Sequence, residues 1–161
     1  MSSKIKQKHF KQSGVIPVYK GKVVVITARG SKRWIIPKGS IDWELTAQES
    51  AAKEALEEAG IKGEVFPEEI GTYTYEKLGG SYKVRLYYME VTKLKDKWDE
   101  KAFRKRKLLT PKQAIKKVVP TSVSKIMASF FHENRHLIKT KKKRKSGKKK
   151  KGKTNSQSKQ T

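Results

Sequence analysis

The residues that decide the fold lie between Gly39 and Ile61, where the sequence reads GSIDWELTAQESAAKEALEEAGI. Within it, Thr46-Ala47-Gln48-Glu49 fits a capping box, in which the Thr and Glu side chains each accept a hydrogen bond from the other residue's backbone N–H. Gly60 suits the position just past a helix end, where the backbone turns left-handed. The stretch therefore predicts a helix over residues 47–59.

This predicted helix has an apolar face and an acidic face. Alanines at 51, 55 and 59 form a narrow apolar stripe that can pack closely against a sheet. Glu54, Glu57 and Glu58 are spaced i, i+3 and i+4, so their carboxylates share the opposite face and repel by about 0.2–0.5 kcal/mol per pair. A hard cation such as Mg²⁺ would relieve this repulsion, because it prefers oxygen ligands. On spacing alone, a solvent-exposed acidic stripe is the commoner explanation.

Runs of β-branched and aromatic residues around the helix predict strands. The expected strands are residues 13–19, 22–28, 34–36, 71–78 and 81–94, with hairpin turns at Lys20-Gly21 and Gly79-Gly80. A charged loop follows at 95–107. Two more helices are expected, one opening at Thr110-Pro111 and one running from Thr121 or Ser122 to about Arg135. Interleaved strands and helices predict an α/β (α+β) fold, in which helices cover a mixed sheet.

The composition excludes several classes of protein. The 161 residues include 40 Lys and Arg, 15 Asp and Glu and no Cys, giving a formal net charge of +25. Without Cys there is no disulfide scaffold, thiolate zinc site or cysteine nucleophile. No apolar run reaches the roughly 20 residues that span a bilayer, and the first residues lack the apolar core of a signal peptide. We expect a cytoplasmic protein with no membrane partner, or a nuclear one if the host is eukaryotic.

The positive charge is concentrated at the C-terminal end. Residues 139–161 contain 12 Lys and Arg and no acidic or apolar residue, so we expect a disordered basic tail. Such a tail would contact RNA or polyphosphate without sequence preference. The preceding part divides into a basic lead-in over 1–12 and a folded domain over 13–138. Nine of the 15 acids lie within 42–69, around the predicted helix.

The stretch 39–61 resembles the Nudix box, whose pattern is Gly, five residues, Glu, seven residues, then Arg-Glu-U-x-Glu-Glu-x-Gly-U with U aliphatic. The matching residues are Gly39, Glu54, Glu57, Glu58, Gly60 and Ile61. Leu45 stands where the family has its first Glu, with Glu44 one residue out of register, and Lys53 replaces the family's Arg. The segments 33–39 and 98–114 are similar to Nudix proteins that cleave diphosphoinositol polyphosphates and diadenosine polyphosphates.

The resemblance, which covers about residues 13–131, implies an α/β/α sandwich and a hydrolase that depends on Mg²⁺, with Mn²⁺ as a substitute. The implied reaction cleaves a phosphoanhydride bond in a polyphosphorylated small molecule, such as a diphosphoinositol polyphosphate or a diadenosine or nucleoside polyphosphate. Metal binding and catalysis are assigned by the resemblance to Glu54, Glu57 and Glu58. Many family members add an acid from outside the box, and Glu100 is the candidate here, ahead of Asp99 and Glu90.

An anionic substrate needs cations near the acidic helix. Arg29, Lys32, Arg33 and Lys38 flank the predicted strand at the entry to the box, and Lys83 and Arg85 alternate on one face of the strand 81–94. The candidates for substrate binding are Arg33, Lys38 and Gly39, followed by Arg29, Lys83 and Arg85. Arginine can grip a phosphate through two N–H groups, whereas lysine acts as a compact charge. For each cation, a purely solubilising role in a lysine-rich protein is an equal alternative.

Leu45 and Lys53 leave a second function open. If these departures weaken catalysis, the chain would be a Nudix-fold protein that binds RNA or polyphosphate through its basic surface and tail. The tail contains no aromatic residue, so no base-stacking surface is predicted there. The tyrosines at 73, 75, 82, 87 and 88 are interpreted first as packing within the sheet.

Overall fold

The computed structural model describes residues 6–139. Of the predicted disordered tail, only Lys139 falls within this range, and residues 1–5 of the predicted lead-in also lie outside the described residues. No helix in the described part of the chain is long and apolar enough to cross a membrane.

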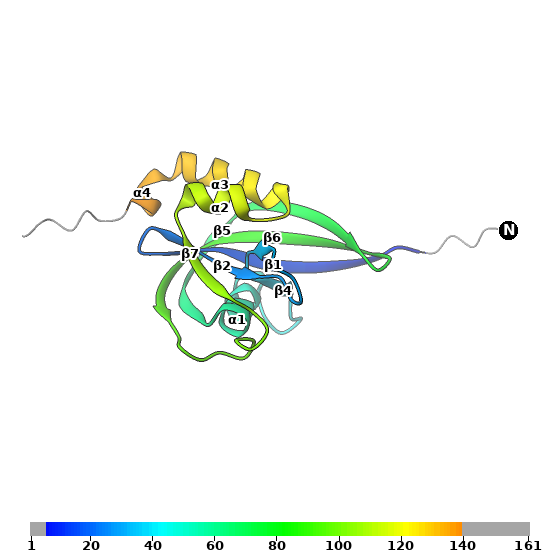
Figure 1. Ribbon diagram of the computed structural model, residues 1–161. Coiled ribbons are helices and arrows are strands. Elements are labelled where there is room, and N and C mark those ends of the chain that lie inside the picture. The colour runs from blue at the N-terminus through cyan, green and yellow to red at the C-terminus, as the bar shows by residue number, and fades with distance from the viewer. Residues whose placement is uncertain (1–5, 140–161) are drawn as a thin grey trace, which may run out of the picture.

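Within residues 6–139, seven strands form one mixed sheet (Figure 1). They are β1 (Lys8–Tyr19), β2 (Lys22–Thr27), β3 (Trp34–Ile35), β4 (Lys38–Ser40), β5 (Ile61–Lys77), β6 (Gly80–Leu94) and β7 (Arg106–Leu109). The order is β3-β2-β1-β6-β5, with β4 also paired to β1 and β7 to β2. β1 and β6 are parallel, whereas the other pairs are antiparallel. The predicted mixed sheet is confirmed.

Helices cover both faces of this sheet. They are α1 (Ala47–Ala59), α2 (Pro111–Lys117), α3 (Thr121–Glu133) and the short α4 (Arg135–Ile138). Figure 1 shows α1 below the sheet and α2 and α3 above it. The three layers confirm the predicted α/β/α sandwich.

Each face of the sheet has its own core, because successive side chains of a strand point to opposite faces. Toward α1, the buried residues include Val15 and the alanine stripe at 51, 55 and 59. Toward α3, they include the next residue of β1, Ile16, together with Met127. The alanines bring the α1 backbone close to the sheet, which places the acidic face of the helix at the edge of the core.

Several strand boundaries differ from the predicted ones. β1 begins at Lys8, within the predicted lead-in, because Lys8–Gln12 pairs with Gly80–Val84 of β6. β5 begins at Ile61, directly after α1, and not at residue 71. β4 and β7 fall in segments where the sequence predicts loops; both are short, and they form strands by pairing with β1 and β2.

The second hairpin turn also differs by one residue. Its central positions are Leu78 and Gly79, with φ angles of 50° and 74°, and Lys77 pairs with Gly80. Two positive φ angles in a two-residue loop match the twist of the flanking strands. Beside this turn, β1, β5 and β6 extend together beyond the helices (Figure 1). We call this extension, residues 8–12 and 72–83, the arm.

Candidate active site

The sequence fixes both ends of α1 locally. Thr46 Oγ1 accepts a hydrogen bond from the Glu49 N–H at 3.0 Å, and Glu49 Oε1 accepts one from the Thr46 N–H at 3.2 Å. Gly60 adopts a left-handed backbone with φ of 64°, and its N–H donates to carbonyls of the last turn. The predicted helix over 47–59 is therefore confirmed, with its capping box.

The loop after β6 is fastened to the C-terminal end of this helix. Trp98 Nε1 donates to the Glu58 carbonyl oxygen at 3.0 Å. The indole also packs so closely on Gly60 that a Cβ there would lie 2.7 Å from the ring. The Glu100 N–H donates to the Glu57 carbonyl oxygen at 3.1 Å. These contacts bring the loop acids beside the helix acids.

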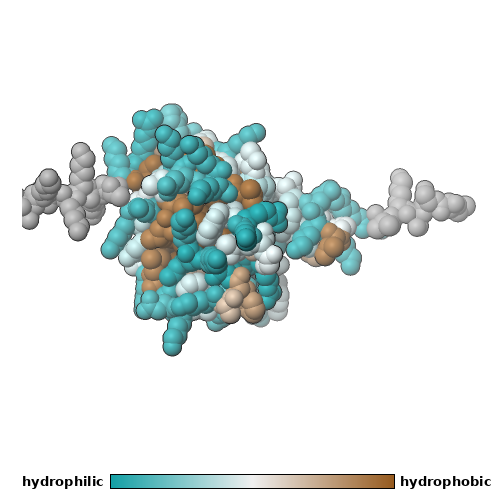
Figure 2. Space-filling model, in the orientation of Figure 1, coloured by the Kyte–Doolittle hydropathy of each residue, from teal (hydrophilic) through white to brown (hydrophobic). Residues whose placement is uncertain are grey.

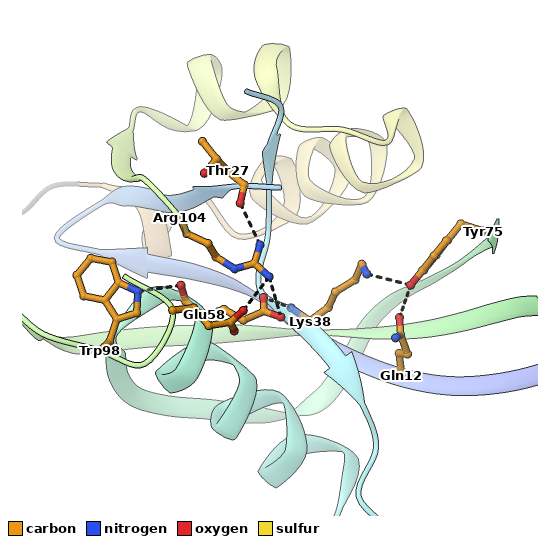
Figure 3. Close-up of polar contacts among 8 residues, drawn as sticks. Gln12, Thr27, Lys38, Glu58, Tyr75, Trp98 and Arg104 are labelled. Carbon is orange, nitrogen blue, oxygen red and sulfur yellow. Dashed lines mark hydrogen bonds and ion pairs between the residues drawn. The ribbon is translucent and has the colours of Figure 1, made fainter. Parts of the chain in front are cut away.

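Glu58 is the most buried carboxylate of the site. It is 6% exposed, and Figure 3 shows it between Lys38 and Arg104. Its Oε2 accepts from the Lys38 N–H at 3.3 Å, and its Oε1 lies 3.5 Å from Arg104 Nη2. Burial raises the pKa of Glu58 to about 8, although the Arg104 charge opposes this shift. Glu58 thus gains a proton more readily than an exposed glutamate.

Arg104 is the cation that faces these carboxylates in the structure. Its Nη2 is 3.5 Å from Glu100 Oε1, and its Nη1 donates to the Thr27 carbonyl oxygen at 3.0 Å. Its buried Nε has no hydrogen-bond partner among the described residues. Arg104 was not among the predicted site residues. The only available signal was its i, i+4 spacing with Glu100.

Glu54 completes the acidic group. Burial raises the pKa of Glu54, the charges of Glu57 and Glu100 raise it further, and a hydrogen bond with Glu58 opposes the rise. The structure therefore brings together all four predicted acids, including Glu100 from outside the helix.

These acids fit a divalent cation by their chemistry. Within residues 6–139, no three acidic or histidine side chains are already arranged to hold a metal ion. The donors are all carboxylate oxygens, which Mg²⁺ and Mn²⁺ prefer. The rise in the pKa of Glu54 caused by neighbouring acids is the repulsion that a bound cation would remove. Glu54, Glu57 and Glu58 would hold the ion, with Glu100 beside them.

Lys38 and Gly39, both predicted to bind substrate, adjoin the acids. Besides its backbone contact with Glu58, Lys38 donates through Nζ to the Tyr75 hydroxyl at 3.0 Å. That hydroxyl in turn donates to Gln12 Oε1 at 2.8 Å. A Cβ added to Gly39 would lie 2.2 Å from the Glu54 Cδ, so only glycine leaves this carboxylate its present place.

The other predicted substrate residues are dispersed. Arg33 is exposed, and its Nε donates to Ser31 Oγ at 3.3 Å. Arg29 lies with its guanidinium carbon 4.7 Å from the centre of the Phe103 ring. Arg85 forms an ion pair of 3.0 Å with Glu69 on β5, and Lys83 is near the same acid. No contact joins Lys83 or Arg85 to the four acids in the described part of the chain.

A cavity of about 820 Å³ lies between the β2–β3 loop and the loop before β7. Its lining includes the cations Lys32, Lys101 and Lys105 and the aromatic residues Trp34 and Phe103. Arg104 also lines this cavity and contacts Glu58 and Glu100, so it connects the cavity to the acids. Lys101 and Lys105 were not predicted, because residues from two distant loops form this wall.

Of the two departures from the box pattern, Lys53 has an acidic partner in the structure. Lys53 Nζ lies 3.8 Å from Asp42 Oδ2, and both side chains are partly exposed. The basic residue at this position therefore keeps an acidic partner, which comes from the loop before α1 and not from position 45.

These features define a class of protein. A capped helix that carries carboxylates packs on a mixed sheet, and a distant loop adds an acid and an arginine. The model of the NUDIX domain matches residues 8–132, and the chain belongs to the Nudix family. It is 32% identical over 112 residues to Nudix hydrolase 12, mitochondrial, of Arabidopsis thaliana, covering 64% of this chain and 55% of that protein.

Two further relatives have more specific names. The chain is 29% identical over 96 residues to diphosphoinositol polyphosphate phosphohydrolase 2 of Rattus norvegicus, covering 58% of this chain and 52% of the relative. It thus spans about half the length of the curated relatives it matches. The crystal structure of a C. elegans Ap4A hydrolase binary complex has a similar fold, with a TM-score of 0.64 and 18% identity over 79% of this chain and 98% of that one.

Replacing Gly39 by Ala should lower catalytic activity while leaving the protein folded. The new methyl group would displace the Glu54 carboxylate from its place, and we expect a loss of about 10- to 100-fold, the range typical of misplaced metal-site partners. Initial rates at saturating Mg²⁺, together with a thermal melt, would measure both effects. The adjacent, exposed Ser40→Ala is the control and should keep the wild-type rate; an equal loss in both variants would contradict the assigned role of Gly39.

Proposed function

We propose that the protein hydrolyses a phosphoanhydride bond in a polyphosphorylated small molecule, using Mg²⁺ or Mn²⁺. The observation that carries this proposal is the position of the four acids beside a cavity lined by lysines, with Arg104 between them. Acids alone would repel a polyphosphate. The cavity lysines attract it, and a divalent cation would join its phosphates to the carboxylates.

The proposed chemistry divides between the cation and the protein. When bound, the cation would neutralise phosphate charge and lower the pKa of a coordinated water. Glu58 would hold it, fixed by the Lys38 N–H. Burial and the charge of Glu57 raise the pKa of Glu54, so Glu54 would accept a proton from that water more readily than an exposed glutamate would. Arg104 would stabilise negative charge that develops on the leaving phosphate.

The cavity also limits the substrate class. Its lysines suit several phosphate groups, and Trp34 and Phe103 offer apolar surface to the rest of the molecule. The volume is within the range of small-molecule sites. Diphosphoinositol polyphosphates and diadenosine or nucleoside polyphosphates both meet these requirements, and the names of two relatives support this pair of candidates.

An assay with purified full-length protein tests the proposal. The protein would be incubated with Mg²⁺ and with inositol pyrophosphates, diadenosine polyphosphates, nucleoside diphosphate sugars and triphosphorylated RNA. We expect hydrolysis of at least one of the first two classes, abolished by EDTA and restored by Mg²⁺ or Mn²⁺. Hydrolysis of none of them would overturn the proposal.

We also propose that residues 139–161 contact RNA or polyphosphate through charge. The support is compositional, since 12 of these residues are Lys or Arg. Contacts of this kind weaken steeply with salt and do not depend on bases. Truncation after Ile138 should therefore remove most of the binding to inorganic polyphosphate, measured at two salt concentrations. Unchanged binding would assign it to the folded domain.

A further inference from the structure

Three aromatic rings form a column across the arm. Phe10 of β1 pairs with Tyr82 of β6, which pairs with Tyr75 of β5. The Phe10 and Tyr82 ring centroids are 4.7 Å apart with planes at 18°, and those of Tyr82 and Tyr75 are 4.8 Å apart with planes at 8°. Cross-strand aromatic pairs stabilise a sheet, but their nearly parallel planes also leave a ring face at each end of the column.

The two ends of this column differ. At one end, Lys38 Nζ lies 4.5 Å from the Tyr75 ring centroid, and the Tyr73 ring follows at 6.3 Å. At the other end, Phe10 is 39% exposed, and Tyr82 is its only aromatic contact within residues 6–139. β4 pairs with β1 at residues 12–14, and the Ile41 N–H donates to the Lys11 carbonyl oxygen at 3.1 Å, so Phe10 lies one residue beyond this flanking segment. The column can therefore accept one more planar ring, on the outer side of Phe10.

A lysine adjoins each end of the column on the same face. Side chains alternate along a strand, so Lys8 lies on the face of Phe10, and Lys77 lies on the face of Tyr75. Both residues pair with Gly80, over which the Phe10 ring packs. Lys8 thus neighbours the open end, where a phosphate next to a stacked base could reach it, while Lys77 adds positive charge at the Tyr75 end.

The rest of the arm is also basic. Lys11 and Lys83 pair on the opposite face, and Glu76 is the arm's single acid, bonded by the Gln7 amide at 2.9 Å. Figure 2 shows the visible face of the arm as mainly hydrophilic, with a small hydrophobic patch near its tip. This charge favours an anionic partner, and the open ring favours a partner that carries unpaired planar groups.

We propose that the arm binds single-stranded nucleic acid, with an unpaired base stacked on the open side of Phe10 and an adjoining phosphate near Lys8. Basic surfaces with aromatic side chains bind single strands in this way, since every base has a flat face to stack. A duplex does not fit, because its bases are already stacked and paired. The open side of Phe10 lies at the opposite end of the column from Lys38 and the acids, so this inference does not depend on the proposed hydrolase activity.

Fluorescence anisotropy with the full-length protein tests this proposal. Two labelled probes of equal length are compared: a single-stranded RNA and an abasic oligonucleotide, which has the phosphates but no bases. Phe10→Ala should weaken RNA binding roughly ten-fold, as expected for one stacked base, and leave abasic binding unchanged. Phe10→Trp should retain RNA binding, because it keeps a flat ring. Trp43→Ala is the matched control, since Trp43 is 89% exposed and lies outside the arm.

The comparison of probes separates stacking from charge, including the charge of the basic tail. Equal binding of both probes by the wild-type protein, or an equal loss of both in Phe10→Ala, would overturn the proposal. So would a loss of RNA binding in Trp43→Ala as large as that in Phe10→Ala. Hydrolysis of the preferred phosphoanhydride substrate should be the same in Phe10→Ala as in the wild type, so the failure of one proposal is distinguishable from failure of the other.

Discussion

Replacing Glu58 by Gln should lower the rate of phosphoanhydride hydrolysis by more than about 100-fold. The amide keeps the shape of the side chain and can still accept the hydrogen bond from the Lys38 N–H. It loses the negative charge that would hold a divalent cation and that faces Arg104 at 3.5 Å. Replacing a residue that only orients a metal ligand typically lowers metal affinity or activity about 10- to 100-fold. Replacing a ligand itself should lower the rate by more than that.

The exposed Glu64 provides a matched control. Glu64→Gln makes the same chemical change on β5, and we expect its kcat/KM to equal that of the wild type. A titration of the rate against Mg²⁺ concentration would show whether Glu58→Gln also weakens metal affinity. A Glu58→Gln protein that hydrolyses the substrate at the wild-type rate would contradict the role assigned to this carboxylate.

The same residue should make the metal-free protein less stable as the pH rises. The ordinary pKa of a glutamate is 4.5, and burial raises the pKa of Glu58 in the folded protein to about 8. Between these values the folded state binds more protons than the unfolded state, so the free energy of unfolding falls with pH by up to about 1.4 kcal/mol per unit. This contribution is complete below pH 4.5 and is lost as the pH rises through 8.

Urea unfolding at pH 5 and pH 8, in the presence of EDTA, would measure this dependence. Glu58→Gln cannot ionise at this position, so its stability should fall less between the two pH values. Adding Mg²⁺ to the wild-type protein should reduce the loss at pH 8, because the cation favours the ionised carboxylates. Equal pH dependence in the two proteins would show that Glu58 is not the group responsible.

The sequence predicts the elements whose signals are local. Thr46, Glu49 and Gly60 define α1 within a few positions, and the structure reproduces its limits. β4 and β7 have no such signal, since Lys38–Ser40 and Arg106–Leu109 form strands only through their pairing with β1 and β2. The extension of β1 back to Lys8 likewise depends on β6, a strand far away in the sequence.

The same distinction between local and long-range signals applies to the candidate active site. The i, i+3, i+4 spacing places Glu54, Glu57 and Glu58 together because a helix imposes that geometry. Arg104 cannot be found in this way, since its contact with Thr27 joins residues 77 positions apart. Lys83 and Arg85 show another limit, because their alternation on a strand describes a face of β6 but not its distance from α1, and their substrate role stays a prediction.

Trp98 anchors the loop between β6 and β7 to the end of α1, and this anchoring affects how substrate preference can change. Beyond the cavity wall, the Arg106 guanidinium stacks 4.3 Å from the Trp98 ring, and its Nη1 donates to the carbonyl oxygens of Ala59 and Gly60. The loop is thus held to the end of α1 on both sides of residues 101–103. Substitutions in this short span can reshape the cavity entrance, while Glu100 and Arg104 keep their places. This part of the wall can therefore change without displacing the two residues that join the loop to the acids of α1.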